Sequence, residues 1–578
     1  MDSDSATDVS AHAATAQHQH QPDPEHQHQD LHKPRSPRHS ASSSTATSSS
    51  PAQAHDTHDT HDTHDLEALD RTATSRSIAE TLPWYRQVLF VAVICLAQLF
   101  TQAGLGQILS IIHIVGATWG LANSPDLSWL IAGYSLTVGT FILFSGRLGD
   151  IFGYKRMFLI GMAWFSLWSC ICGLAVYSSH VLFVFSRVLQ GIGPAIILPN
   201  GLAILGATYA PGRTKSLAFA AFGGTAPAGS IIGGTFSGLF ALAWWPWTFW
   251  CFALVLAATV VLGYFVIPDI PTHRPPPRTL ADILTRLDVL GALLGVTGLI
   301  LFNFAWNQAP IAGWDAPYIG VTLALGVLLL AAYLVVEVRF APEPLVPFAA
   351  LSSDVAFVLA AVACGWGSFG IWIWYSWEFL LELRAASPLL ACAWFSPVVV
   401  SGACAAAVVG FLLHIIGPPR VMAGALLAFT VGSVLMATCP IDQTYWAQTF
   451  VSFVVTPWGM DMSFPAATLI LSNAVARQHQ GIAASLVNTV VNYSIALALG
   501  VAGTVESRTN PGGAASDKAL VLRGYRNAYY LGIGIAALGV CVCVWFIVHH
   551  AREERRRKKN ENEGSATHAA DGQGQEKA

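Results

Sequence analysis

The chain has 578 residues, of which 53% are hydrophobic and 11% are charged. Soluble globular domains contain about 25% charged residues, so this composition excludes a soluble enzyme. The formal net charge of -4 is small and gives no sign of a nucleic-acid partner.

The N-terminal segment, residues 1-85, is polar and repetitive. It contains a Ser/Thr run from Ser40 to Ser50 and the triplet repeat HDTHDTHDTHD from His55 to Asp65. Because too few apolar groups are present to offset the entropy of ordering, we predict a disordered cytoplasmic tail. The spaced histidines could bind a metal ion, but no fixed partners would orient them, so a solvated low-complexity tail is the favoured interpretation.

Fourteen hydrophobic stretches follow between residues 86 and 549. A helix that crosses a bilayer needs about 20 apolar residues, so the sequence predicts an all-α integral membrane protein with 14 transmembrane helices. Loops that join even to odd spans carry more than twice as many Lys and Arg residues as the opposite loops. By the positive-inside rule, we expect both termini to be cytoplasmic.

Two loops share one pattern, which indicates an internal repeat. GRLGDIFGYKR follows span 2 and GFLLHIIGPPR follows span 10, with two glycines and an arginine in the same register. These residues are Gly146, Gly153 and Arg156 in the first loop, and Gly410, Gly417 and Arg420 in the second. We therefore predict two parallel six-helix repeats at residues 86-270 and 346-549, with two inserted spans at 271-345. Two such halves around a central site form an alternating-access architecture.

The loop after span 2 combines small and charged residues. Gly146 and Gly149 are expected to let helix ends approach closely. Asp150 can meet the positive N-terminus of a neighbouring helix and the loop cations Lys155 and Arg156. A solvated loop acid is the alternative interpretation of Asp150.

Span 4 contains RVLQGIGPA, which places Arg187 within the hydrophobic stretch. An isolated arginine in hydrocarbon costs about 2.5 to 3.5 kcal/mol on insertion scales, so Arg187 must face a cavity or a partner. The alternative is that it snorkels to the outer headgroups.

Span 5 reads GGTAPAGSIIGGTFSGLF, with glycines at the spacing that lets two helix backbones pack face to face in lipid. These glycines are Gly229, Gly233, Gly234 and Gly238. Pro227 is expected to supply a kink in the same helix. Plain helix packing explains the same residues and can operate together with a role in transport.

The repeat assigns spans 1, 4, 9 (residues 354-376) and 12 to the walls of a central cavity, with two residues of span 13 (residues 481-504) added. The predicted substrate cavity contains Gln98, Gln102, Asn200, Trp372, Tyr375, Asn488 and Asn492. Aromatic faces suit flat organic substrates and cations. Trp and Tyr also collect at membrane interfaces, and that alternative stays open for span 9.

Asp461 is the only acid that we place deep in a core span. A carboxylate at this depth is expensive unless it is paired, protonated or hydrated, so we predict that it carries proton coupling. The alternative is a structural hydrogen bond to Asn488 or Asn492. We interpret His113 in span 1 as a packing histidine.

The C-terminal segment, residues 550-578, opens with AREERRRKKN, and we predict a basic, disordered cytoplasmic tail that contacts anionic lipid. The spans contain no cluster of His or Asp at metal-ligand spacing, no nucleophile elbow and no phosphate-binding loop. We therefore expect no enzyme activity, no cofactor and no metal site.

The motifs resemble those of the major facilitator superfamily. GRLGDIFGYKR is similar to its span 2 to 3 signature, and RVLQGIGPA is similar to its R-x-x-x-G-x-G motif. GSIIGG is similar to the antiporter signature G-P-x-x-G-G, with Ser230 at the proline position. With 14 spans, the chain resembles the fourteen-span drug:proton antiporter branch, and within it the fungal group of aminotriazole-resistance and low-affinity ammonium transporters.

The resemblance implies roles for particular residues. Gly146, Gly149, Asp150, Gly153, Lys155 and Arg156 would form a conformational latch between the two halves. Arg187 would assist proton transfer or substrate binding, together with Asp461. Thr101 and Gln102 stand where many relatives carry an acid in span 1.

The resemblance also implies a function. We expect a monomeric transporter of the plasma membrane, with the vacuolar membrane as the alternative, whose partners are a small-molecule substrate, protons and the lipid bilayer. It would expel a drug, toxin or secondary metabolite in exchange for protons. The alternative is a facilitator or importer of a small polar or ionic solute such as ammonium.

Overall fold

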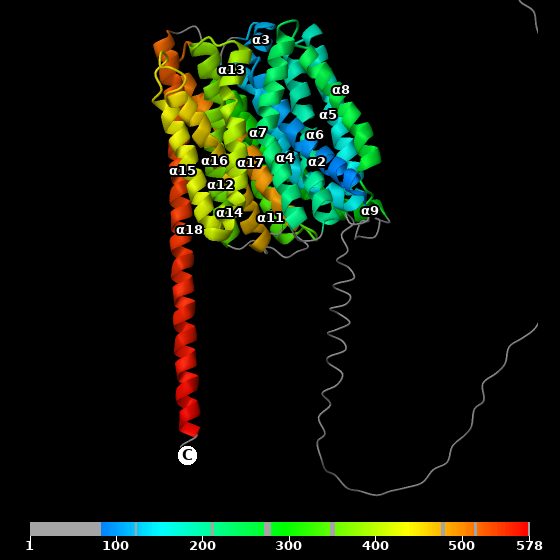
Figure 1. The fold of residues 1–578 in the computed structure, drawn as a ribbon. Coiled ribbons are helices and arrows are strands. Elements are labelled where there is room, and N and C mark those ends of the chain that lie inside the picture. Colours follow the sequence, from blue (N-terminus) through cyan, green and yellow to red (C-terminus); the bar gives the residue numbers. More distant parts are fainter. Residues whose placement is uncertain are drawn as a thin grey trace, which may run out of the picture. The chain divides into compact units, whose positions relative to one another are not determined.

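The structure, a computed structural model, describes residues 82-121, 124-209, 213-270, 279-346, 353-474, 480-513 and 517-575. The regular elements in these ranges are helices (Figure 1). Residues 1-81, which hold nearly all of the predicted N-terminal tail, lie outside the described part of the chain.

The first half contains α2 (Trp84-Leu109), α3 (Ile112-Ala117), α4 (Ser124-Phe152), α5 (Tyr154-Leu174), the 3-10 turn η2 (Ala175-Tyr177), α6 (His180-Thr208), α7 (Arg213-Ala241) and α8 (Trp247-Val266). The inserted segment contains α9 (Leu280-Arg286), α10 (Val289-Ala312) and α11 (Pro317-Arg339). The second half contains α12 (Ser353-Glu378), the π-helical turn η4 (Phe379-Leu383), α13 (Pro388-Phe395), α14 (Pro397-Ile415), α15 (Pro418-Ala437), α16 (Gln448-Ala474), α17 (Gln480-Thr509) and α18 (Lys518-Gln575).

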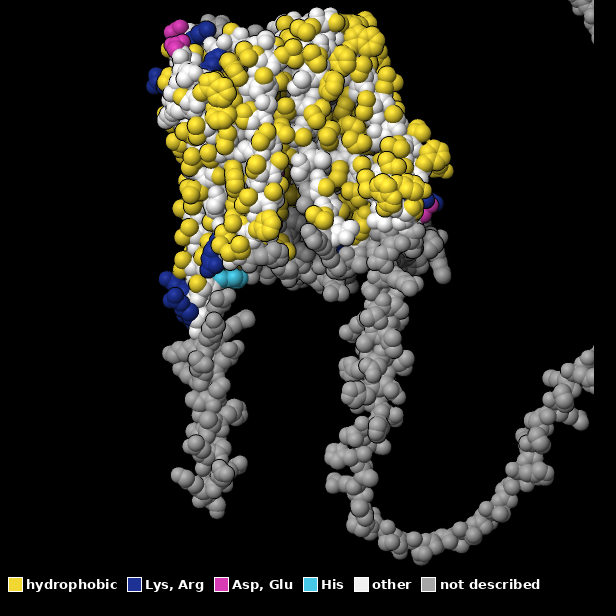
Figure 2. Space-filling view, in the orientation of Figure 1, with side chains coloured by type: hydrophobic (Ala, Val, Ile, Leu, Met, Phe, Trp, Pro, Cys, Tyr) yellow, Lys and Arg dark blue, Asp and Glu magenta, His cyan; other side chains and the backbone are white. Residues whose placement is uncertain are grey.

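Thirteen segments of the described chain are long and apolar enough to cross a bilayer. α16 is also long enough at 27 residues, but polar side chains such as Ser452 and Asp461 lower its hydropathy. With α16, the chain has the 14 predicted spans. Hydrophobic side chains cover the visible face between the two ends of the bundle, and the visible charged groups lie near those ends (Figure 2). The protein is an integral membrane protein.

Helix packing confirms the predicted repeat. In the first half α2 packs on α7, α5 packs on α6 and α8, and α4 packs on α6. In the second half the equivalent pairs are in contact: α12 with α17, α15 with α16 and α18, and α14 with α16. The two repeats therefore build the same arrangement of six helices.

The matching loops adopt the same backbone conformation. Gly153 precedes α5 with φ 94°, and Gly417 precedes α15 with φ 80°. Residues with a Cβ atom rarely adopt such angles, so each position favours glycine. The repeat in the sequence is a repeat in the backbone.

The halves meet along two seams. In one, α4 packs on α17, where a methyl group at Gly139 would lie 2.8 Å from the backbone nitrogen of Tyr493. In the other, α7 packs on α13 and α14. The inserted α10 contacts both α4 and α17, and Asn307 donates a hydrogen bond to the carbonyl of Ala496 (3.1 Å). The inserted pair therefore lies beside the α4-α17 seam.

The two ends of the bundle differ in how the halves share a core. We call them the α3 end, which also holds α13, and the α9 end (Figure 1). At the α3 end, buried residues of the first half such as Ile112, Leu130 and Phe183 belong to one cluster with the second half. Toward the α9 end, the first half has its own cluster, including Phe90, Phe158 and Leu205, with no residue of the second half. The hydrophobic contact between the halves is therefore greatest at the α3 end.

Two predicted boundaries differ from the structure. α18 continues as a helix to Gln575, whereas we predicted a disordered tail from residue 550. The first charged residues of this C-terminal segment are Arg and Glu, which are good helix formers. They extend a helix that is already nucleated in the bundle. Span 9, predicted to end at 376, continues through Glu378 and η4 to Leu383.

The glycines of α7 bring two backbones into direct contact. A methyl group at Gly229 would lie 2.3 Å from the carbonyl oxygen of Leu99, and one at Gly233 would lie 2.5 Å from that of Ala103. From the opposite side, a methyl group at Gly106 of α2 would lie 2.0 Å from the carbonyl oxygen of Ser230. The predicted close packing of span 5 is confirmed, and its partner is α2.

Gly233→Ala should therefore lower the unfolding temperature of the purified protein, because the new methyl group must push α2 away from α7. Overpacking of this kind costs about 1 to 3 kcal/mol. Gly223→Ala is a matched control on the same helix, since no atom lies within 4 Å of the position its methyl group would take. Equal unfolding temperatures for the two variants would contradict the assigned packing.

Candidate functional site

The loop between α4 and α5 places its glycines against other helices. A methyl group at Gly146 would lie 3.1 Å from the hydroxyl of Ser485 on α17, across the α4-α17 seam. One at Gly149 would lie 1.9 Å from Oδ1 of Asn200 on α6. The predicted close approach of helix ends is present, and Gly146 lies at the boundary between the halves.

The charged residues of this loop make separate contacts. The hydroxyl of Tyr154 donates a hydrogen bond to Asp150 (2.7 Å), and Lys155 pairs with Asp269 after α8 (3.1 Å). Arg156 is exposed. Among the described contacts, Asp150 therefore bonds to Tyr154 and forms no ion pair with Lys155 or Arg156.

Arg187 is fully buried within the first half. Its guanidinium donates to the carbonyls of Leu130 on α4 (3.1 Å) and Gly104 on α2 (2.9 Å), and to Gln190 on its own helix. It also lies over the ring of Tyr134, 4.6 Å from the centroid. Arg187 therefore joins three helices and does not snorkel to headgroups.

Asp461 lies at the α7-α14 seam. A methyl group at Gly402 of α14 would lie 2.7 Å from Oδ2 of Asp461 and 3.0 Å from Cγ of Pro227 on α7. That oxygen is buried and accepts no hydrogen bond from the described residues. In a regular helix the backbone carbonyl of Asp461 would accept a hydrogen bond from the N-H of residue 465. Residue 465 is proline and has no N-H to donate. The structure thus brings the predicted coupling acid together with Pro227, the residue expected to kink span 5.

The other predicted cavity residues have varied surroundings. Asn200 is buried between α6 and α4 and donates to the carbonyl of Ile196 (2.7 Å). Asn492 donates to the carbonyl of Asn488 (2.9 Å) and lies beside Gly139 at the α4-α17 seam. The structure does not bring either asparagine of α17 into a hydrogen bond with Asp461. Gln98 and Gln102 are half-buried on α2.

The aromatic residues of span 9 lie inside the second half. Trp372 donates to the hydroxyl of Ser452 (2.9 Å), and Tyr375 donates to Glu506 (2.8 Å). Both side chains are almost fully buried, so neither lies on the outer surface of the bundle.

Three further acids lie at the α3 end, each at or near the end of its helix. Glu378 ends α12, Glu382 lies in η4 and Glu506 lies near the end of α17. Glu378 and Glu506 are buried. Glu382 accepts a hydrogen bond from Tyr525 of α18. These acids were missed because α12 and α17 continue beyond the predicted ends of their spans.

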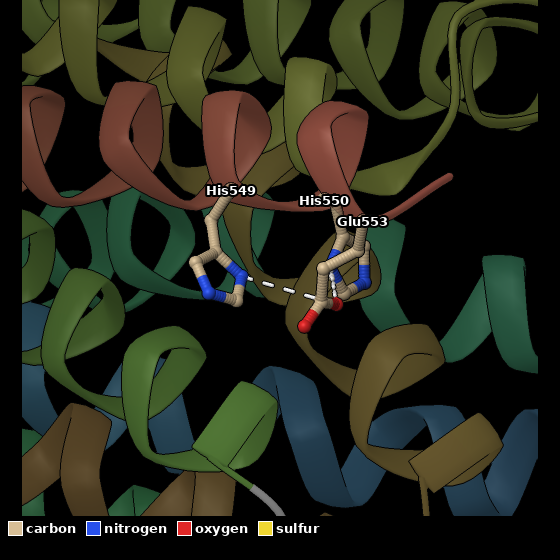
Figure 3. A group of neighbouring side chains, drawn as sticks. All are labelled: His549, His550 and Glu553. Carbon is tan, nitrogen blue, oxygen red and sulfur yellow. Dashed lines mark ion pairs between the residues drawn. The ribbon is translucent and has the colours of Figure 1, made fainter. Parts of the chain in front are cut away.

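Two groups of described His and Glu side chains could hold a metal ion. In the first, His113 of α3 pairs with Glu378 (3.4 Å) and lies close to Glu382. In the second, His549 and His550 flank Glu553 at 3.9 Å on one stretch of α18 (Figure 3). The first group joins the two halves and could not be read from the sequence, because its residues are far apart in the chain. His113 is thus an ion-pair partner and not only a packing residue.

Residues 89-499 and 357-573 match the Major Facilitator Superfamily. A low affinity ammonium transporter of Saccharomyces cerevisiae is 54% identical over 79% of this chain and 88% of its own length. The efflux pump terJ of Aspergillus terreus is 46% identical over 81% of this chain and 89% of its length. The aminotriazole resistance protein of Saccharomyces cerevisiae is 38% identical over 82% of this chain and 86% of its own length.

Solved structures share the fold at low sequence identity. A POT family transporter in complex with 5-aminolevulinic acid superposes with a TM-score of 0.59 at 13% identity, over 81% of this chain and 96% of that one. The human organic anion transporter MFSD10 gives a TM-score of 0.54 at 15% identity, over 80% of this chain and 100% of that one. The repeat, the two seams and these likenesses agree: the chain is a transporter, not an enzyme, and belongs to the major facilitator superfamily.

Proposed function

We propose that the protein exports small organic compounds by proton-coupled alternating access. The observation that carries this proposal is the position of Asp461, whose buried Oδ2 has no described hydrogen-bond partner and lies beside Pro227 and Gly402 at the α7-α14 seam. Desolvation disfavours a charged carboxylate, and hydration favours it. A seam that opens and closes to water would therefore change the protonation of Asp461.

The direction of transport is proposed from two kinds of support. The relatives include proteins named efflux pumps, among them terJ at 46% identity. The distribution of Lys and Arg favours cytoplasmic termini, which puts the α9 end in the cytoplasm and the α3 end outside. The shared core at the α3 end then corresponds to a conformation closed to the outside.

A second candidate is a facilitator or importer of a small cation. It is favoured by the 54% identity to a low affinity ammonium transporter and by Gln102, which stands where many members of the branch carry an acid. Under this candidate, Asp461 would be structural and a proton gradient would not drive transport.

Metabolite profiling of a deletion strain and its parent, at two clamped external pH values, separates the two candidates. We expect an organic compound to be retained inside the deletion strain, with the difference greatest when the inward proton gradient is large. A solute missing from the deletion strain would instead favour the importer.

Asp461→Asn should remove the pH-gradient dependence of export, because an amide cannot exchange a proton. Gly402→Ala should weaken export for a different reason, since its methyl group would displace the carboxylate. Gly410→Ala is the matched control on α14, where no atom lies within 4 Å of the new methyl group. Full gradient-dependent export by Asp461→Asn protein would exclude the proton role.

The latch proposed for the α4-α5 loop has its own test. Asp150→Ala should reduce transport severalfold with surface expression largely intact, and Tyr154→Phe should reproduce part of the loss because it removes the hydroxyl bonded to Asp150. Asp269→Ala changes an exposed acid of the same region and should have a smaller effect. If the Asp150→Ala protein disappears from the membrane, the residue has a folding role instead.

A further inference from the structure

Three side chains from the two halves converge at the α3 end. His113 comes from α3 in the first half, Glu378 from the end of α12 and Glu382 from η4 in the second. One possible ligand atom from each lies within 4.8 Å of the others. The two seams described above do not include this contact, so it is a third connection between the halves.

Glu378 gives this group a buried carboxyl group that protein donors do not satisfy. The residue is 0% exposed, and neither carboxylate oxygen accepts a hydrogen bond from a described residue. Buried charges normally are paired and hydrogen-bonded or coordinate a metal ion. The only ion-pair partner described for Glu378 is His113.

Two cationic side chains near this end donate hydrogen bonds to backbone carbonyls and not to these carboxylates. Lys518 donates to the carbonyl of Leu383 (3.2 Å), and Arg384 donates to the carbonyls of Ile441 (3.1 Å) and Gln443 (2.8 Å). Among the described residues, no Lys or Arg forms an ion pair with Glu378 or Glu382. The two carboxylates therefore retain the capacity to bind a cation.

The separation of the His113 and Glu378 ligand atoms fits a transition-metal ion. His113 Nε2 and Glu378 Oε1 are 3.4 Å apart, and His113 Nε2 has no described hydrogen-bond partner. This is longer than a charge-assisted hydrogen bond, which measures about 2.7 to 2.9 Å. Two ligands of one tetrahedral zinc ion, each about 2.05 Å from the metal, would be about 3.3 Å apart.

The surrounding backbone and side chains hold the third ligand in place. Tyr525 donates its hydroxyl proton to one oxygen of Glu382, which is the kind of outer hydrogen bond that orients a carboxylate ligand. Glu382 lies in a π-helical turn, and the following Ala385 has φ 50°. Such backbone departures concentrate at functional sites.

We propose that His113, Glu378 and Glu382 form a binding site for a divalent transition-metal ion, with Zn²⁺ as the best match, which connects the two halves at the α3 end. Imidazole nitrogen and carboxylate oxygen are both zinc ligands, and three protein ligands leave a fourth position for water. His113 is one-third exposed, which gives an ion a path to the site.

Zinc bound here would favour the conformation in which the α3 end is closed. The ligands come from both halves, so the complete site exists only while the halves are together at this end. A ligand shifts an equilibrium toward the state that binds it better. By holding the α3 end closed, zinc would inhibit transport. This inhibition rests on the proposed alternating access, whereas zinc binding itself does not.

The test is thermal unfolding of the full-length protein in detergent, with zinc chloride as the probe. Binding to the folded state raises the unfolding temperature, so we expect a rise of several degrees for the natural sequence. His113→Ala should abolish the rise or require at least about 10-fold more zinc. His113→Cys should keep it, because a thiolate is also a zinc ligand.

Two further histidines supply matched controls. His180→Ala removes an exposed histidine at the start of α6, and His550→Ala disrupts the group on α18. Both should keep the zinc-dependent rise. Glu378→Gln provides an independent variant should His113→Ala fold poorly, and it should also lose the rise.

Three results would overturn the proposal. The first is that zinc does not raise the unfolding temperature of the natural sequence, and the second is that it raises that of His113→Ala protein equally. The third is the same His113-dependent rise with magnesium or ammonium chloride, which would make the site a nonselective cation site. Closure is measured separately by hydrogen-deuterium exchange, which zinc should slow in α3 and η4 together. Slower exchange in η4 alone would place the ion within one half and would contradict a bridge.

Discussion

The cost of a charged group in a bundle that excludes water is the constraint that organises this protein. For Arg187 this cost is offset by hydrogen bonds, because its guanidinium donates to backbone carbonyls of two neighbouring helices and to Gln190. For Asp461 and Glu378 it is not, since each has a buried carboxylate oxygen without a described hydrogen-bond partner. A satisfied charge stabilises one arrangement of helices, whereas an unsatisfied charge responds to protons, ions or water. The difference separates the hydrogen-bonded arginine from the two acids with unsatisfied oxygens.

Small residues explain how two halves can be rigid inside and movable between them. Within the first half, the backbones of α2 and α7 touch at Gly106, Gly229 and Gly233, so these helices cannot separate without losing many close contacts. At the α7-α14 seam, Gly402 leaves just enough room for Asp461 and Pro227. Nothing continues this contact at Gly223 and Gly224, where a methyl group would meet no atom within 4 Å. Close contact of α7 with the second half is therefore found at Gly234 and Gly238, beside Cys392 and Leu389 of α13, and not at Gly223 and Gly224.

Local patterns in the sequence predicted most of the fold. Hydrophobic length gave the 14 spans, and the paired loop glycines gave the repeat, because left-handed backbone conformations at Gly153 and Gly417 restrict both positions in the same way. Spacing within α7 predicted close packing. The sequence did not show that α2 is the partner, because spacing on one helix does not identify the other.

The candidate site was harder to predict, for a physical reason. Asp461 could be found because an acid in the middle of an apolar stretch is conspicuous. Glu378 and Glu382 lie where hydropathy declines, Glu378 at the end of α12 and Glu382 in the π-helical turn that follows it. The pairing of His113 with Glu378 depends on how the two halves meet, and this information is not contained in either segment.

The two acids lie at different places along the boundary between the halves, which gives them opposite relations to its motion. In the proposed cycle, Asp461 gains access to water when the α7-α14 seam opens, so that a change in its protonation accompanies a change of conformation. Glu378 has its histidine partner only while the α3 end is closed, so an ion bound there stabilises the closed state. A ligand with different affinities for two states shifts their populations by the ratio of those affinities. A proton at Asp461 can therefore be part of the transport cycle, whereas a metal ion at His113 and Glu378 opposes the step that opens the α3 end.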